Sequence, residues 1–77
     1  MMSEFAKTKL ALRETYNEQR RVCRLRLRDL KGLLRYVVDD ESKAALECAV
    51  ETEQRLLLAL GELEGAIRRI GGTANAG

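Results

Sequence analysis

The chain divides into two helix-length halves of opposite charge, joined by a short acidic segment. Residues 1–38 carry ten Lys and Arg against four Asp and Glu, which gives a net charge of +6. Residues 39–77 carry four against eight, a net charge of −4, so the two halves sum to +2. The sequence contains no proline, and both halves are rich in helix formers. We therefore predict two long amphipathic helices that fold back on each other.

Capping signals give the expected limits of these helices. We expect the first helix over residues 3–38, a turn over 39–41, the second helix over 41–70 and a flexible tail over 71–77. Ser3 is a good N-cap for the first helix, and Asp39 or Asp40 can cap the second. The second helix should end before Gly71, because glycine readily ends a helix. These limits predict one all-α, coiled-coil-like antiparallel hairpin over residues 1–70.

An uninterrupted helix through residues 36–44 is the alternative fold, because neither Gly nor Pro marks the turn. Such a chain would form a long two-stranded coiled coil. Two valines followed by three consecutive acidic residues disfavour continuation at this point. The hairpin is therefore the fold that we predict.

Each predicted helix carries an apolar stripe with the alternating spacing of paired helices. The stripe of the first helix consists of Phe5, Leu12, Tyr16, Cys23, Leu27, Leu30, Leu34 and Val37. That of the second consists of Leu46, Ala49, Leu56, Leu60, Leu63, Ile67 and Ile70, widened by Ala45, Val50, Leu57, Ala59 and Ala66. One partner helix covers a narrower stripe than this. We therefore predict a homodimer in which two hairpins form a four-helix bundle, with the second helix at its centre.

Two acidic residues interrupt the second stripe. With a turn near residue 40, Glu53 should lie beside Arg24 and Arg28, and Glu64 near Tyr16 and Arg13. One interpretation is a buried ionic pair that fixes the helix register. The other, which we favour, is a partly exposed pair at the edge of the seam, contributing at most about 1 kcal/mol.

A basic stripe about 39 Å long accompanies the apolar stripe of the first helix. It consists of Lys9, Arg13, Arg20, Arg24, Arg28, Lys31 and Arg35. Duplex phosphates would accept such a stripe, so RNA or DNA binding is an alternative function. The small net charge, the lack of an aromatic side chain placed to stack on bases, and the acidic second helix argue for internal pairing instead. Binding to a membrane surface is not expected, since the chain has no Trp.

Catalysis, metal ions and cofactors are not expected. The chain has no His to act as a general base, and two thiols do not complete a zinc site. Cys23 and Cys48 fall several helical turns apart in the hairpin, so we expect two buried free thiols in a reducing compartment. A reactive Cys23, activated by nearby arginines, is the less favoured interpretation. The N-terminal residues show no apolar signal segment, which predicts a cytoplasmic protein.

The length and predicted topology are similar to those of two known groups. One contains short cytosolic helical hairpins that act as co-chaperones for type III secretion needle subunits. The other is the plasmid copy-number protein that binds paired RNA loops as a dimer of hairpins. Small phage proteins that disable a host regulator would share the same outline. No diagnostic motif aligns with any of them, so the similarity concerns shape alone.

The wide apolar surface and the absence of a catalytic constellation predict a non-enzymatic protein that binds other proteins. It would act as a regulator, an inhibitor or a co-chaperone, and its partners would be a second copy and an unidentified protein. The expected partner-binding residues are Leu56, Leu57, Leu60, Leu63, Ile67 and Ile70, with Arg20, Arg24 and Arg28 beside them.

Overall fold

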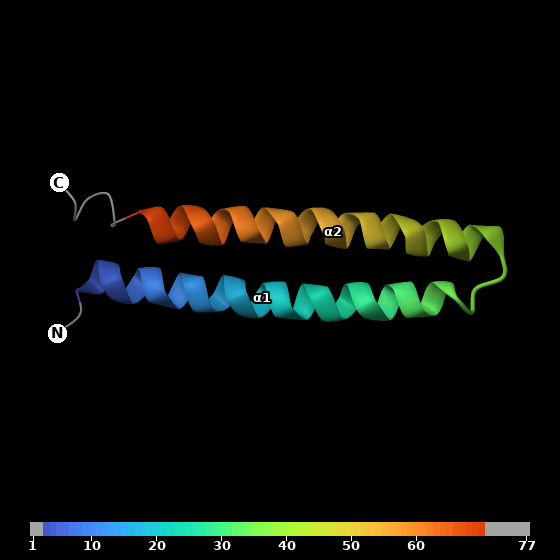
Figure 1. The fold of residues 1–77 in the computed structure, drawn as a ribbon, viewed down its shortest axis with the longest axis horizontal. Coiled ribbons are helices and arrows are strands. Elements are labelled where there is room, and N and C mark those ends of the chain that lie inside the picture. The colour runs from blue at the N-terminus through green and yellow to red at the C-terminus, as the bar shows by residue number, and fades with distance from the viewer. Residues whose placement is uncertain (1–2, 71–77) are drawn as a thin grey trace.

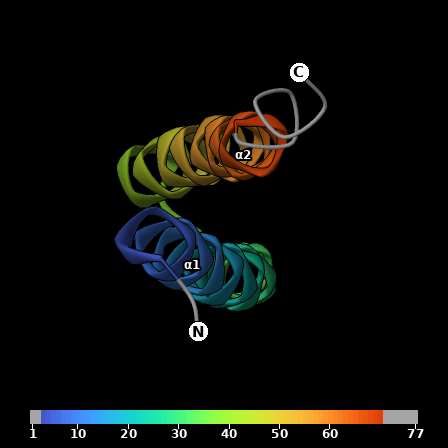
Figure 2. The same ribbon diagram turned by 90° about the vertical axis from the view of Figure 1, so that its left-hand side faces the viewer.

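The computed structural model describes residues 3–70, which form two antiparallel helices lying side by side (Figure 1). Helix α1 spans Glu4–Leu34 and helix α2 spans Asp40–Arg69. The end-on view shows the two axes tilted in opposite senses, so that the helices cross along their length (Figure 2). No strand occurs among residues 3–70. The predicted all-α helical hairpin is confirmed.

Side-chain caps start both helices. The Ser3 hydroxyl accepts a hydrogen bond from the Ala6 amide at 3.1 Å, as expected for an N-cap. The Asp39 carboxylate accepts one from the Ser42 amide at 2.8 Å, so Asp39 is the residue that caps α2. This bond to Ser42 holds the pKa of Asp39 below its ordinary value.

Helix α1 ends at Leu34, four residues before the predicted limit. The amides of Arg35 and Tyr36 bond to carbonyls three residues back, which tightens the last turn. The β-branched Val37 and Val38 then leave the helix, where their side chains keep more rotamer freedom. This break excludes the uninterrupted helix. The predicted tail over residues 71–77 lies outside the described residues.

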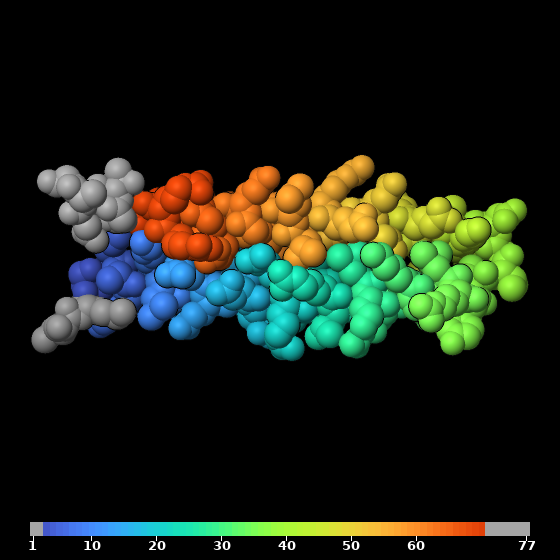
Figure 3. Space-filling view, in the orientation of Figure 1, coloured from blue at the N-terminus to red at the C-terminus, as the bar shows by residue number. Residues whose placement is uncertain are grey.

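The two helices meet along a seam whose residues alternate in steps of three and four, the spacing of a coiled coil. On α1 the seam consists of Ala6, Lys9, Arg13, Tyr16, Arg20, Cys23, Leu27, Leu30, Leu34 and, just beyond it, Val37. On α2 it consists of Leu46, Val50, Glu53, Leu57, Leu60, Glu64 and Ile67. All of these residues are buried or half-buried. The space-filling view shows the helices in contact along their length (Figure 3).

The seam departs from the predicted stripes in the half that lies near the chain ends. Phe5 and Leu12 are 55% and 41% exposed, while Lys9 and Arg13 occupy the seam. Glu64, and not Leu63, occupies it on α2. In the half next to the loop, apolar residues fix which side of each helix faces the other. The same three-four spacing, continued toward the chain ends, places polar side chains in the seam there.

The core of the hairpin is small. Among residues 3–70, the buried hydrophobic side chains are Cys23, Leu27 and Leu60, and the one buried charged residue is Glu64. A chain of this size is marginally stable alone, because it removes little apolar surface from water. Much of the apolar surface stays exposed on one side of the seam, which is where a candidate site lies.

Candidate protein-binding surface

The seam separates two long faces of the hairpin, and one of them is apolar. On each helix, the residue immediately before a seam residue points to this side. Such residues of α1 and α2 together line three grooves between the helices. We call this side the apolar face. It consists of Phe5, Leu12, Val22 and Leu33 of α1 with Tyr36 just beyond it, and Ala45, Ala49, Leu56, Ala59, Leu63 and Ala66 of α2 with its C-cap Ile70.

Helix α2 contributes a second regular stripe to the apolar face. Its members Ala45, Ala49, Thr52, Leu56, Ala59, Leu63, Ala66 and Ile70 again alternate in steps of four and three. The three large side chains Leu56, Leu63 and Ile70 are 39%, 47% and 54% exposed. A helix with two adjacent heptad stripes is typical of a helix with two helical neighbours, as in a four-helix bundle. In the hairpin only one of the two stripes of α2 is covered.

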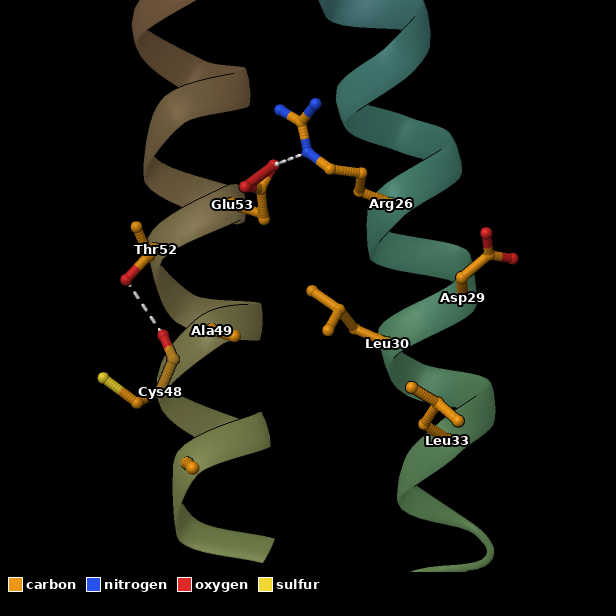
Figure 4. A pocket seen from close by; sticks show the side chains of 9 residues that line it. Arg26, Asp29, Leu30, Leu33, Cys48, Ala49, Thr52 and Glu53 are labelled. Atoms are coloured by element: carbon orange, nitrogen blue, oxygen red, sulfur yellow. Dashed lines mark hydrogen bonds and ion pairs between the residues drawn. The ribbon is translucent and has the colours of Figure 1, made fainter. Parts of the chain in front are cut away.

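A groove of about 620 Å³ lies in the half of the apolar face next to the loop. Leu30 and Leu33 line it from α1, and Ala45 and Ala49 from α2. Figure 4 shows the two leucines across an open space from Ala49. The groove exists because α2 offers only small side chains here.

An ion pair closes one end of this groove (Figure 4). The Arg26 guanidinium donates a hydrogen bond from Nε to Glu53 Oε1 at 2.8 Å, and the Glu53 side chain is only 17% exposed. This bond, with a second from the Cys23 thiol, holds the pKa of Glu53 below its ordinary value. We expected Arg24 and Arg28 here. Arg26 pairs with Glu53 instead, because it lies beside the seam on the apolar face, whereas Arg24 and Arg28 lie on the other side.

The two cysteines have different environments. Cys23 is fully buried, and its Sγ lies 3.2 Å from the Glu53 carbonyl oxygen. Burial, followed by the bond to Glu53, raises the pKa of Cys23, so its thiol stays neutral and is a poor nucleophile. Cys48 is exposed, and its sulfur points away from α1 in Figure 4. Both are free thiols, but the prediction that both are buried is wrong for Cys48, which lies at the edge of the groove with its sulfur turned away from α1.

Glu64 is a buried carboxylate that forms an ionic cluster in the half of the seam near the chain ends. Its side chain is 4% exposed, and its two oxygens face Arg68 and Arg13. The bond from Arg68, with a smaller contribution from Arg13, holds the pKa of Glu64 below its ordinary value. Arg13 Nε lies 3.5 Å from Glu64 Oε1, which confirms that these residues are neighbours. The carboxylate is buried, but the Arg13 and Arg68 side chains are 38% and 60% exposed, so the pair is partly exposed, as we favoured. Because sliding the helices would leave the buried carboxylate unpaired, the pair also favours one register over others.

The opposite side of the hairpin carries a group of exposed charged side chains. We call it the charged face, and it consists of Arg21, Arg24, Arg28 and Lys31 of α1 and its C-cap Arg35, with Glu47, Glu51, Gln54 and Leu58 of α2. Arg24, Gln54 and Leu58 line one groove on this side. The face therefore sets basic side chains of α1 beside acidic side chains of α2.

The predicted basic stripe does not lie on one surface. Lys9, Arg13 and Arg20 are half-buried in the seam, whereas its last four members are exposed on the charged face. Arg13 pairs with Glu64, and the Nε of Arg20 is buried without a hydrogen-bond partner. The Arg20 guanidinium lies 3.9 Å from the position of a Cβ on Gly61. A continuous row of phosphate contacts would need these three side chains to leave the seam.

The nine predicted partner-binding residues fall into three groups. Leu56, Leu63 and Ile70 lie on the apolar face. Leu57, Leu60 and Ile67 pack in the seam together with Arg20. Arg24 and Arg28 lie on the charged face.

The contribution of α1 to the apolar face was missed in the sequence. Phe5 and Leu12 were assigned to the seam, and Leu33 was assigned to no stripe. These residues could have been found from their positions, because each comes immediately before a seam residue. In an antiparallel pair, such residues of α1 lie beside the second stripe of α2.

Comparison with known proteins adds no family assignment. No protein-family model matches the chain, and no curated protein or solved structure is significantly similar to it. Within residues 3–70, no group of three His, Cys, Asp or Glu side chains is arranged to hold a metal ion. Neither α1 nor α2 is long and apolar enough to cross a membrane.

Proposed function

We propose that this protein is a small non-enzymatic binding protein that regulates, inhibits or chaperones a protein partner through its apolar face. The observation that carries the proposal is the second heptad stripe of α2, whose large side chains Leu56, Leu63 and Ile70 are about half exposed. An amphipathic helix fits such a stripe, because its own apolar residues recur at the same spacing. The partner would thus supply one or two helices that complete a bundle.

Arg26 is the basic residue best placed to add specificity at this surface. Its side chain is 49% exposed at the end of the groove, where it also holds Glu53. A partner helix with an acidic residue beside its apolar stripe would meet Arg26 at the rim. Charges at an interface rim steer association and fix register more than they raise affinity.

Without its partner, the apolar face would be covered by a second copy of the chain. The resulting homodimer would be a four-helix bundle, and the partner would compete with the second copy for the same surface. The exposed free thiol of Cys48 supports a reducing compartment, and we propose the cytoplasm.

Affinity purification with two matched leucine variants tests this proposal. Leu63→Lys puts a charge on the apolar face, whereas Leu58→Lys puts the same charge on the charged face, where Leu58 is 67% exposed. We expect the original chain and Leu58→Lys to recover the same protein from the native cell, and Leu63→Lys to lose it. Equal recovery by all three chains, or recovery of nothing but the protein itself, would contradict the proposal.

RNA or DNA binding is the second candidate, because Arg24, Arg28, Lys31 and Arg35 remain exposed on one face. Four phosphate contacts would make the affinity fall about a hundredfold between 50 and 200 mM salt. Replacing Arg24 and Arg28 by Gln should flatten that dependence and leave the helicity unchanged. If neither mixed RNA nor duplex DNA shifts in mobility at 50 mM salt, this candidate is eliminated.

A further inference from the structure

The apolar face changes in side-chain size along its length. Next to the loop, α2 presents the small residues Ala45, Ala49 and Thr52, and the groove lies over them. Toward the chain ends it presents Leu63 and Ile70. On α1, Phe5 and Leu12 add further large side chains at that same end, and they line a groove with Ile70. The face therefore has a hollow half and a filled half.

A second copy of the chain has the size needed to cover this face. The hairpin measures 57 × 20 × 13 Å, so a second copy matches its broad side in both length and width. A copy also carries, on one surface, both the hollow and the large side chains that would fill it. The face is thus complementary to itself if one copy is reversed end to end.

Two-fold symmetry allows two ways of stacking the apolar faces. With the axis parallel to the helices, both loops lie at the same end, and α1 of each copy covers α2 of the other. The two filled halves would then meet and crowd, and the two hollow halves would leave a void. Protein interiors are close-packed, and both voids and excess volume destabilise them.

With the axis perpendicular to the helices, the loops lie at opposite ends and each filled half covers a hollow half. If the axis passes near Leu56, Ala49 of one copy faces Leu63 of the other. The cross-helix contacts place Leu56 level with Arg20, so the same axis sets Phe5 opposite Tyr36 of the second copy. On either side of the axis, the facing positions of α2 then combine large with small side chains, which keeps the packed volume near constant there.

We propose that the protein forms a two-fold homodimer through its apolar face, with the loop of each hairpin beside the chain ends of the other. This rests on the proposed role of the apolar face as a binding surface and adds the orientation of the two copies. Helix α2 packs on α2 of the second copy, and Leu56 meets its own equivalent at the axis.

Spin-label distances test the orientation. Arg55→Cys lies near the proposed axis and Glu41→Cys near the loop, and both positions are exposed on α2. Labels go on a chain with Cys48→Ala, in which buried Cys23 stays unlabelled. We expect a distance under about 30 Å between copies at position 55, and one of about 45 Å at position 41, from the rise of thirty helical residues.

Each outcome of this measurement is decisive. Short distances at both positions would place the loops together and overturn the orientation, leaving the apolar face as the interface. No distance between copies at either position would overturn the homodimer. Neither result affects the proposed partner binding, which the recovery of a protein by Leu58→Lys but not by Leu63→Lys decides.

A size exchange gives an independent test. Ala49→Leu should crowd the hollow and Leu63→Ala should leave a void, so each should weaken the homodimer about tenfold or more. The double variant restores one large and one small residue to each contact and should dimerise within a few-fold of the original chain. Additive losses in the double variant, measured by sedimentation equilibrium, would show that residues 49 and 63 do not meet.

Discussion

Arg26 Nε lies 2.8 Å from Glu53 Oε1, and this contact ties the middle of α1 to the middle of α2. A second cross-helix pair, Arg13 with Glu64, lies closer to the chain ends. Together they hold the helices in register at two separate points. Sliding one helix by a turn would separate both pairs and bury unpaired charge, which is costly.

Removing the buried carboxylate alone should destabilise the hairpin. Glu64→Leu leaves Arg13 in the seam without its partner, so we expect a lower thermal midpoint by circular dichroism. The double variant Arg13→Leu with Glu64→Leu should recover the midpoint or exceed it, because the seam becomes apolar at both positions. If Glu64→Leu has the same thermal midpoint as the original chain, the pair of Arg13 with Glu64 does not stabilise the hairpin.

Stability should fall as the solution becomes acidic. The folded-state pKa values of Asp39, Glu53 and Glu64 lie below their ordinary values, which are 3.8 for Asp and 4.5 for Glu. The unfolded chain therefore binds more protons at low pH, and the stability from these groups is full above about pH 4.5 and is lost below it. Urea unfolding midpoints at pH 3, 4, 5 and 7 check this. A midpoint unchanged between pH 7 and pH 3 would contradict it.

The two thiols should react at very different rates. Cys48 is exposed, whereas Cys23 is buried, bonded to Glu53 and held neutral by its raised pKa. We expect one thiol per chain to react rapidly with a chromogenic disulfide reagent at pH 8. The second thiol should react only when urea unfolds the helices. The Cys48→Ala chain should lose the fast equivalent. Rapid reaction of both thiols in the folded protein would place Cys23 at the surface.

Gly32 should be replaceable with a gain in stability. A Cβ added there would have nothing within 4 Å outside its own helix. Gly32→Ala should therefore raise the free energy of unfolding by about 0.5–1 kcal/mol, the difference in helix propensity. Ala11→Gly, at the same heptad position of α1, should lower it by a similar amount. A loss of stability in Gly32→Ala would reveal a close contact at this position, for instance with another copy.

The sequence predicted the helices and their caps well because these depend on local interactions. Ser3 and Asp39 each satisfy an amide three residues ahead, and this requirement is independent of the rest of the fold. The turn was also predictable, since valines and consecutive acids both disfavour a helix interior.

The choice of seam residues was harder to predict. Leu56 and Leu57 differ by 100° around α2, and both belong to an apolar surface that spans about half of the helix. Only the partner helix decides which of the two is covered. Arg26 was missed for the same reason: its position beside Glu53 depends on which flank of α1 faces the groove.

The uneven chemistry of the seam also bears on how the hairpin assembles. Its loop half joins Leu27, Leu30 and Leu34 to Leu46 and Val50, residues close together along the chain. Closing that short loop costs little entropy, so folding should nucleate there and proceed toward the chain ends. Amide hydrogens beside Lys9 and Glu64 should then exchange faster than those beside Leu30. The two helices would separate first at the chain ends, while the loop half stays packed. A competing helix would then enter first at Phe5 and Ile70.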